Sequence, residues 1–317
     1  MQSFTSSNSS FTECVRNHIQ LLHTNDNTPE TLLNGTLMWN KKDFLPQDHT
    51  SLPTHSSSST SFQFSDCSFT NCYYASSGGA ISLDNSYSSL LVEKSSFTGC
   101  NVPMFSDGPS GGAISCRPCY SVSISYSSFI SCKGSKGGGV YLWGISFFCS
   151  VSGCVFTQCE AKDWGNALLL RELPSINGGN TNTNNNNHPP ACSLCRFLHN
   201  EHRVVTSGAI YFLPSYGAHT LKENLYTSNN ADHYGGAVEY NVDGNYQVTC
   251  AIFYFNFFSD NNAKGNGDDV VFTYNDKYST WSPFFHCFST TTSNRVAFAA
   301  GSTPYRYNDT WLPQTNF

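Results

Sequence analysis

The stretch Ser96–Ala113 reads S-F-T-G-C-N-V-P-M-F-S-D-G-P-S-G-G-A and contains the two signals that recur along this chain. The first is a Phe followed three residues later by Cys, here Phe97 and Cys100. The second is Gly-Gly-Ala followed by a β-branched residue, here Gly111–Ile114. Self-similarity at a fixed period is typical of a repeat protein, so this pair of motifs is interpreted before any other feature.

The aromatic motif recurs in phase, with Cys at its second position in the early copies and Asn in the later ones. The pairs are Phe69 and Cys72, Phe97 and Cys100, Phe129 and Cys132, Phe156 and Cys159, Phe197 and Asn200, Tyr226 and Asn229, and Phe258 and Asn261. Successive aromatics are 28, 32, 27, 41, 29 and 32 residues apart. The long step contains the Asn-rich stretch 175–190, which we interpret as a loop inserted between two strands.

The glycine motif follows each aromatic after 8 to 14 residues. Its copies are Gly78-Gly79-Ala80, Gly111-Gly112-Ala113, Gly137–Val140, Gly165-Asn166-Ala167, Ser207-Gly208-Ala209, Gly235-Gly236-Ala237 and a degenerate Gly267–Val270. Paired glycines permit a positive φ at a tight corner, and the following Ala fits where a larger side chain would not. We therefore expect a sharp corner once in every repeat.

Short runs of alternating polarity between the motifs, such as Ala80–Leu83, Ser89–Val92 and Val122–Tyr126, predict strands. A unit of this size cannot bury its apolar face alone, so it has to stack on its neighbours at about 4.8 Å per coil. Stacking brings equivalent residues into columns. We expect one interior column of aromatic rings and one of Cys or Asn, with the Asn side chains bonded as a ladder and the thiols packed in reduced form.

The composition fits an all-β protein and excludes several classes of partner. Only 12% of residues are charged, the net charge is −6, and the basic residues are scattered, so nucleic acid and anionic membranes are not expected partners. Met1–Gln20 is polar and shows no secretory signal, and no run of about 18 apolar residues predicts a transmembrane segment or anchor.

The periodicity divides the chain into three segments. Residues 1–61 contain one early copy, Phe11 with Cys14, and are interpreted as an N-terminal cap with an irregular arm. Residues 62–272 contain the steady β-helix repeats, and residues 273–317 are interpreted as a C-terminal cap.

The alternation of G-G-A-[IV] with F-x-x-[NC] resembles the repeat of the polymorphic membrane proteins, known from chlamydial surface autotransporters and from trichomonad protists. The resemblance covers about residues 62–272. The tail, with Phe284–Cys287, Ser293–Val296 and Trp311–Pro313, looks more like the closing segment of the protist proteins than like the chlamydial barrel. The resemblance implies a right-handed parallel β-helix of pectin-lyase-like type at a cell surface or outside the cell, with an adhesive role.

Few residues could carry catalysis. Asp268 and Asp269 form the only adjacent acidic pair, near Asp260, Lys264 and His286, but they lie where the last glycine motif degenerates. We interpret the pair as a turn or cap feature. The isolated loop carboxylates, Asp163, Asp232 and Asp243, are expected to be solvated. We expect no catalytic residue and no cofactor.

Two cysteine pairs, Cys116-x-x-Cys119 and Cys192-x-x-Cys195, have spacings found in zinc sites. The pairs are far apart in sequence and each lies at a repeat turn, so buried thiols or local disulfides are favoured over a metal site. Tyr141, Trp143 and Trp164 could form a strip that contacts carbohydrate or protein, although we favour a role in covering strand corners.

The sequence thus predicts an all-β, right-handed parallel β-helix with terminal caps. Its predicted role is a non-enzymatic scaffold for adhesion or partner binding, with protein or glycan ligands, for example on a host cell. The alternative is a carbohydrate-active enzyme, either a polysaccharide lyase or a glycoside hydrolase, because the same fold carries such enzymes and fold alone does not fix activity. A cleft with two carboxylates and a base would favour this alternative.

Overall fold

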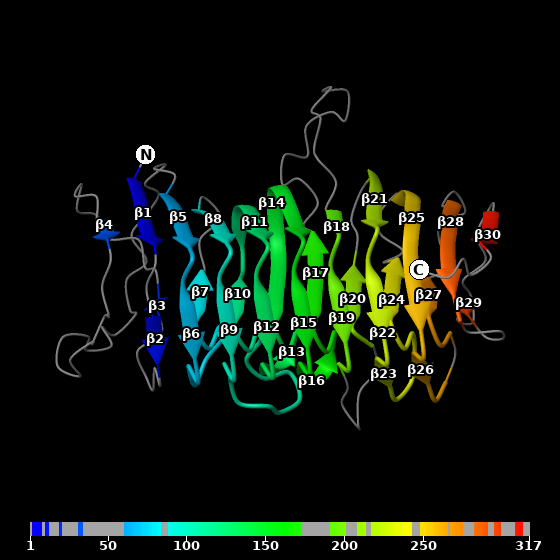
Figure 1. Cartoon of the computed structure of the whole chain (residues 1–317), viewed down its shortest axis with the longest axis horizontal. Helices are drawn as coiled ribbons and strands as arrows, with labels where there is room; N and C mark the ends of the chain where they lie inside the picture. Colours follow the sequence, from blue (N-terminus) through cyan, green and yellow to red (C-terminus); the bar gives the residue numbers. More distant parts are fainter. Residues whose placement is uncertain are drawn as a thin grey trace.

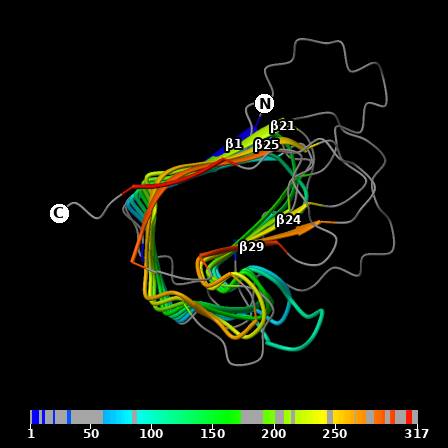
Figure 2. The same cartoon turned by 90° about the vertical axis from the view of Figure 1, so that its right-hand side faces the viewer.

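The computed structural model describes residues 2–7, 10–12, 19–20, 31–33, 60–83, 88–172, 191–200, 208–213, 217–242, 248–265, 267–274, 282–290, 295–298 and 308–312. The regular structure in these residues consists of strands, which stack along one axis in Figure 1. The strands pair in parallel with their counterparts in neighbouring coils, and Figure 2 shows the coils superposed when viewed along the axis. The predicted parallel β-helix is confirmed.

Each coil contributes to three faces. The first face contains β1 (Gln2–Ser7), β5 (Thr60–Ser65), β8 (Ser88–Glu93), β11 (Cys119–Ser125), the second half of β14 (Val140–Ser152), β18 (Ala191–Ser193), β21 (Gly217–Lys222), the first half of β25 (Val248–Ser259), β28 (Ser282–Ser289) and β30 (Asn308–Leu312). The second face contains β2 (Ser10–Thr12), β6 (Ser68–Thr70), β9 (Ser96–Thr98), β12 (Ser128–Ile130), β15 (Val155–Thr157), β19 (Arg196–Leu198), β22 (Leu225–Thr227) and the second half of β25.

The third face contains β3 (Ile19–Gln20), β7 (Ile81–Leu83), β10 (Ile114–Cys116), the first half of β14, β17 (Leu168–Glu172), β20 (Ile210–Leu213), β24 (Val238–Val242), β27 (Val270–Tyr274) and β29 (Val296–Phe298). Four short strands lie between the second and third faces and pair as β13 (Lys133–Lys136) with β16 (Glu160–Trp164) and β23 (Asn230–Ala231) with β26 (Asn262–Ala263). β4 (Thr31–Leu33) pairs with β1.

The paired coils extend past both ends of the predicted repeat region. β1, β2 and β3 pair with β5, β6 and β7, and Phe11 lies in register with Phe69. At the other end β28, β29 and β30 continue the first and third faces beyond residue 272. Segments 1–61 and 273–317, predicted as caps, therefore contribute strands to the helix.

The Asn-rich stretch 175–190 lies outside the described residues, but its effect on register is visible on either side. Phe156 and Phe197 are partners in neighbouring strands even though the chain between them is longer than in the other repeats. The strand register is therefore maintained from one side of this stretch to the other, as the periodicity predicts.

The predicted aromatic column is present in the interior. The rings of Phe69, Phe97, Phe129, Phe156, Phe197, Tyr226 and Phe258 stack with centroid separations of 4.7, 4.9, 4.7, 5.0, 5.1 and 4.9 Å and interplanar angles of 8° or less. All seven side chains are buried. The stack forms because strand pairing places like residues in neighbouring coils directly above one another.

The second-face strands are bounded on both sides by a residue with positive φ followed by a small inward side chain. The predicted column after the strand is Cys72, Cys100, Cys132, Cys159, Asn200, Asn229 and Asn261. A second column before the strand was not predicted, and it consists of Cys67, Ser95, Ser127, Cys154, Cys195, Asn224 and Asn256. The full motif is thus [CSN]-x-[FY]-x-x-[CN], and the first position escaped notice because three residue types share it.

Cys and Asn interchange in these columns because both donate a hydrogen bond to the same backbone carbonyl. The Cys159 thiol donates to the carbonyl of Phe129 in the preceding coil, at a sulfur–oxygen distance of 3.4 Å. The Asn229 side-chain amide donates to the equivalent carbonyl of Phe197 at 2.9 Å, and also to Oδ1 of Asn261 at 3.0 Å. The predicted Asn ladder is therefore present, and it adds a bond between coils that Cys does not supply.

The glycine corner combines a positive φ with close backbone contact. The first glycine of the motif has φ values such as 74° at Gly78 and 71° at Gly111. A Cβ on Gly112, the second glycine of its motif, would lie 2.1 Å from the carbonyl oxygen of Gly138 in the next coil. No L side chain fits at that distance, so the paired glycines set how closely the coils approach at this corner.

Candidate interaction surfaces

The acidic pair at the last glycine motif has a structural role, as the sequence indicated. Asp269 occupies the position of the motif Ala and is fully buried, where its carboxylate accepts hydrogen bonds from Asn261 Nδ2 at 3.2 Å and from the Ser289 hydroxyl at 2.5 Å. Asp268 accepts a bond from the backbone N–H of Ala263 at 3.1 Å. Asp269 therefore ends the Asn ladder, and its hydrogen bonds to Asn261 and Ser289 match a capping role.

The remaining acidic candidates lie in separate places. Asp163 accepts a hydrogen bond from the backbone N–H of Asp107, and Asp232 pairs with Lys264. Asp243 lies outside the described residues. Asp163 and Asp232 therefore contact different parts of the molecule.

The two cysteine pairs belong to different parts of the interior. Cys116 ends β10 and Cys119 begins β11, whereas Cys192 lies in β18 and Cys195 in the column before the second face. In the described part of the chain, twelve cysteines are free and buried, and no group of three or more metal-ligating side chains occurs. Burial raises the pKa of Cys116 and Cys132, so both thiols stay protonated at neutral pH.

Tyr141, Trp143 and Trp164 contribute to a second apolar cluster outside the helix, on the outer surface of the third face. Tyr141, Leu169 and Tyr211 are its buried members, and Trp143, Trp164 and Leu213 flank them. Trp164 stacks on Tyr211 with a centroid separation of 5.6 Å, and Trp143 stacks on Tyr141 at 5.8 Å. Trp164 thus covers Tyr211 of β20 and Trp143 covers Tyr141 of its own strand β14, instead of the two joining one exposed strip, which agrees with the favoured interpretation.

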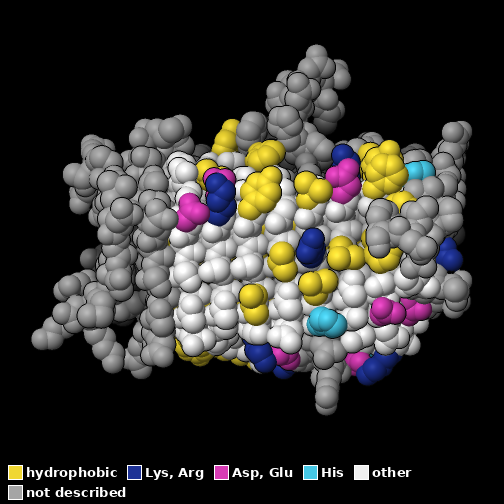
Figure 3. All heavy atoms as spheres, viewed as in Figure 1, with side chains coloured by type: hydrophobic (Ala, Val, Ile, Leu, Met, Phe, Trp, Pro, Cys, Tyr) yellow, Lys and Arg dark blue, Asp and Glu magenta, His cyan; other side chains and the backbone are white. Residues whose placement is uncertain are grey.

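The outer surface of the second face changes chemistry along the helix. Its outward residues flank the aromatic column and are Ser68, Thr70, Ser96, Thr98, Ser128, Ile130, Val155, Thr157, Arg196, Leu198, Leu225, Thr227, Phe257 and Ser259. The N-terminal half is therefore a hydroxyl ladder, with Ser96 donating to Ser68 at 3.2 Å. Apolar side chains gather over the C-terminal half, as Figure 3 shows in yellow.

Arg196 lies at the centre of this apolar surface and is the one charged residue among those outward positions. Val155 and Leu225 are its partners in the neighbouring strands, while Leu194 and Leu198 lie two residues away along the chain. Together with Phe257 these residues define the Arg196 patch. Leu194 is 55% exposed, and Arg196 forms none of the ion pairs found among the described residues.

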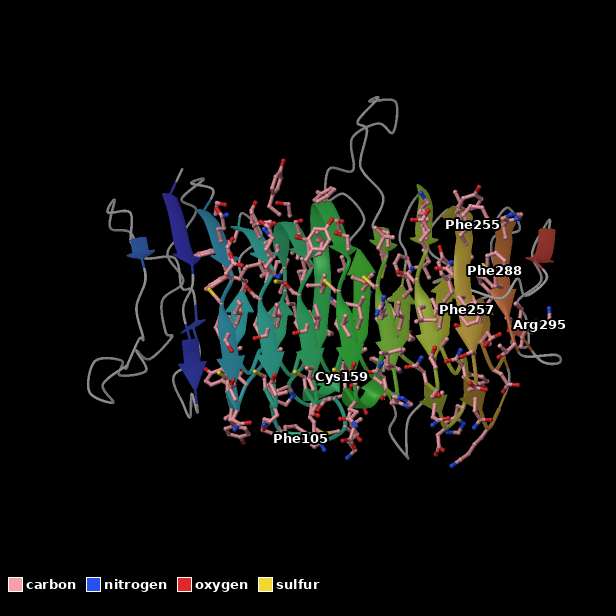
Figure 4. The ribbon with its side chains drawn as sticks, viewed as in Figure 1. Phe105, Cys159, Phe255, Phe257, Phe288 and Arg295 are labelled. Carbon is pink, nitrogen blue, oxygen red and sulfur yellow. The ribbon has the colours of Figure 1, made fainter. Side chains whose placement is uncertain are left out.

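An aromatic cluster continues the Arg196 patch toward the C-terminal end. The Phe255 ring lies 5.1 Å from the His286 ring and 6.4 Å from the Phe288 ring, and Tyr254 lies 5.5 Å from His286. Figure 4 shows Phe255, Phe257 and Phe288 near one another at this end of the molecule. Contiguous exposed apolar surface on a soluble domain marks an interaction site more often than a structural accident.

A second exposed aromatic lies at the tip of an ordered loop between the second and third faces. Phe105, labelled in Figure 4, is 52% exposed. Its backbone is held by Ser135, whose hydroxyl donates to the Phe105 carbonyl at 2.8 Å and accepts from the Phe105 N–H at 3.1 Å. Lys136 pairs with Asp107 on the same loop at 2.8 Å. The loop therefore presents Phe105 in a fixed position.

Glu239 lies in β24 on the side of the third face that points away from the helix interior, but neighbouring side chains bury it. It is 5% exposed, its Oε2 has no hydrogen-bond partner, and burial raises its pKa from 4.5 to about 8. The Thr273 hydroxyl on the adjacent strand β27 is also buried without a partner. Glu239 is therefore neutral at pH 7, and the repeat pattern does not reveal it because its strand partners, Tyr211 and Val271, belong to neighbouring coils.

None of the described residues forms a helix long and apolar enough to cross a membrane. Comparison of the chain with known protein families, with curated proteins and with solved structures finds no match.

Proposed function

We propose that this protein is a non-enzymatic β-helix scaffold that binds a partner through its second face, and that it acts in adhesion at a cell surface or outside the cell. The observation that carries the proposal is the Arg196 patch, an apolar surface around a guanidinium that forms no ion pair with the residues that the structure describes. Surfaces of this composition, with aromatic and Arg side chains among apolar neighbours, supply most of the affinity in protein interfaces.

The change of chemistry along one face supports the proposal. The same strand positions carry Ser and Thr in the early coils and Val, Leu and Phe in the later ones. The fold does not require this change, because outward side chains do not pack in the helix interior. Selection for contact with a partner gives a reason for it.

The repeat of the polymorphic membrane proteins, which this chain resembles, supports the surface location and the adhesive role in the proposal. The ordered Phe105 loop adds a second presented aromatic at a different edge of the rod. A rod with separate contact sites suits binding to large partners, since linked weak contacts raise the overall affinity.

The proposal is tested with two defined probes, a displayed library of 12-residue peptides and a panel of immobilised glycans. We expect the intact chain to retain probes that Leu198→Asp loses by about tenfold or more, because a buried unpaired charge opposes docking. The matched control is Thr98→Asp. Thr98 occupies the position of Leu198 three coils earlier, in the hydroxyl half of the second face. Equal retention by both variants would remove the second face from the proposal.

A carbohydrate-active enzyme is the second candidate function, and Glu239 is the observation that favours it. A carboxyl group with a pKa of about 8 remains protonated at neutral pH, as a general acid requires. The glycan panel is therefore also scored for released product. Release that Glu239→Gln abolishes would overturn the non-enzymatic role, whereas binding without release supports it.

A further inference from the structure

We infer a second ligand site on the outer surface of the third face, where Arg117, Trp143 and Arg171 form an anion site suited to a linear acidic oligosaccharide. These residues lie in consecutive coils. Trp143 and Arg171 are partners in β14 and β17, and Arg117 directly follows Cys116, whose partner is Leu142. The site lies on a different face from the Arg196 patch and does not depend on it.

The two guanidinium groups are held by the same indole ring. The Arg171 guanidinium carbon lies 3.7 Å from the centroid of the Trp143 ring, and the Arg117 carbon lies 5.6 Å from it. Cation–π stacking of this kind orients the planar group and leaves its N–H edges free for an anion. Trp143 thus fixes the orientation of both cations.

Neither arginine has a carboxylate partner in the described part of the chain. In each ion pair found there the cation is a lysine, for example Lys136, whose partner is Asp107. Two neighbouring cations repel each other, and in a chain with a net charge of −6 carboxylates are abundant enough to compensate them. Uncompensated, stacked guanidiniums are the arrangement that binds carboxylate or sulfate through paired hydrogen bonds.

The spacing of the site selects a repeating anion. Residues two coils apart in one column are separated by roughly 10 Å, twice the strand spacing. An oligosaccharide with an acidic group on alternate sugars places charges at a comparable interval, and the sugar between them can pack its C–H groups against the rim of Trp143. Nucleic acid is disfavoured because its affinity depends on many phosphate contacts, and only two cations are present here.

The ligand chemistry is tested by fluorescence titration of the full chain with four probes of similar length: a sulfated glycosaminoglycan hexasaccharide, a hexagalacturonate, a hexaglutamate peptide and a single-stranded oligonucleotide. We expect at least one of the two saccharides to bind with an affinity that falls as salt rises. Arg117→Gln and Arg171→Gln should each weaken binding by about tenfold, since each removes charge-assisted hydrogen bonds.

Two variants control for structure and location. Trp143→Phe should weaken saccharide binding less than either arginine substitution and should remove any change in emission that arises from Trp143. Lys222→Gln, which removes a cation paired with Glu223 on the first face, should leave saccharide binding unchanged. Thermal unfolding of each variant verifies the fold.

The outcomes separate the alternatives. Saccharide binding that survives the double variant Arg117→Gln/Arg171→Gln overturns the site. Absence of saccharide binding, or equally tight arginine-dependent binding of the peptide or the oligonucleotide, overturns the assignment of an acidic oligosaccharide. Leu198→Asp is titrated in parallel because it alters only the second face, so loss of binding through the two arginines is distinguished from loss through the Arg196 patch.

Discussion

At the scale of single residues, the interior aromatic column shows how sharply the environment differs between neighbours in one strand. Phe129 lies between Phe97 and Phe156, with centroid separations of 4.9 and 4.7 Å, and is fully buried. Its neighbour Ile130 faces outward and is 38% exposed. The two residues are adjacent in one strand but differ completely in environment.

Phe129→Ala is therefore expected to lower the free energy of unfolding by about 3–5 kcal/mol, because it leaves a cavity in a stack whose neighbours cannot collapse. Ile130→Ala should change it by less than about 1 kcal/mol, since the side chain is partly solvated. Denaturant unfolding of both variants gives the comparison. Similar losses would show that the ring of Phe129 is not buried in a column.

Glu239 predicts a pH dependence of stability. Its pKa is about 8 in the folded protein against 4.5 for an exposed Glu, so the folded state retains a proton that the unfolded state has lost between these values. The contribution of Glu239 to stability is largest below about pH 4.5, falls as pH rises toward 8, and then becomes constant, with a total loss on the order of 5 kcal/mol.

Glu239→Gln removes the ionisation while preserving the shape of the side chain. The variant should be more stable than the parent at pH 8, and the difference should shrink as the pH approaches 5. Thermal unfolding at several pH values measures this. A constant difference between variant and parent over that range would show that Glu239 is not buried as a neutral acid.

At the scale of elements, Gly138 and Gly139 are adjacent in one glycine corner but differ in how much space a side chain would have. A Cβ at Gly138 would lie 2.2 Å from the carbonyl oxygen of Asn166 and 2.4 Å from that of Glu160. A Cβ at Gly139 would meet its nearest atom, the carbonyl oxygen of Ala167, at 3.0 Å. Other copies of the motif carry Ala at the position of Gly139, including Ala113 and Ala167.

We expect Gly138→Ala to destabilise the protein by several kcal/mol, because the backbone of the next coil has to move, and Gly139→Ala to cost about 1 kcal/mol or less. Chemical denaturation of the purified variants tests the ranking. A reversed ranking would mean that the second glycine of the motif does not contact the adjacent coil.

The elements also show how far sequence could predict this structure. The repeat predicts the strands, the aromatic column and the glycine corner, because each depends on one residue type recurring in phase. The column of Cys67, Asn224 and their equivalents escaped prediction because Cys, Ser and Asn share its position, so no single residue type recurs in phase. The Arg196 patch needs the exact alignment of Val155, Arg196 and Leu225 across the inserted loop, which periodicity alone leaves undetermined.

At the scale of the whole molecule, the residues that stabilise the fold are different from those on the surfaces available to a partner. Strand pairing, the aromatic stack and the Asn ladders occupy the interior, so the outer surfaces of the second and third faces are free to vary. The Arg196 patch and the site at Arg117, Trp143 and Arg171 use this freedom on different faces. The rod can therefore carry the two proposed contact sites without any change to its core.

The central claim is that neighbouring coils lie in register, and disulfide trapping tests it most directly. Ser89 and Ser121 are partners in β8 and β11, with their hydroxyl oxygens 2.8 Å apart, whereas Ser123 is the partner of Leu91. In-register pairing predicts that Ser89→Cys/Ser121→Cys forms a cross-link under mild oxidation, because in-register strands lie within the Cα range of a disulfide. Ser89→Cys/Ser123→Cys should remain reduced, and preferential cross-linking of that offset pair would contradict the account.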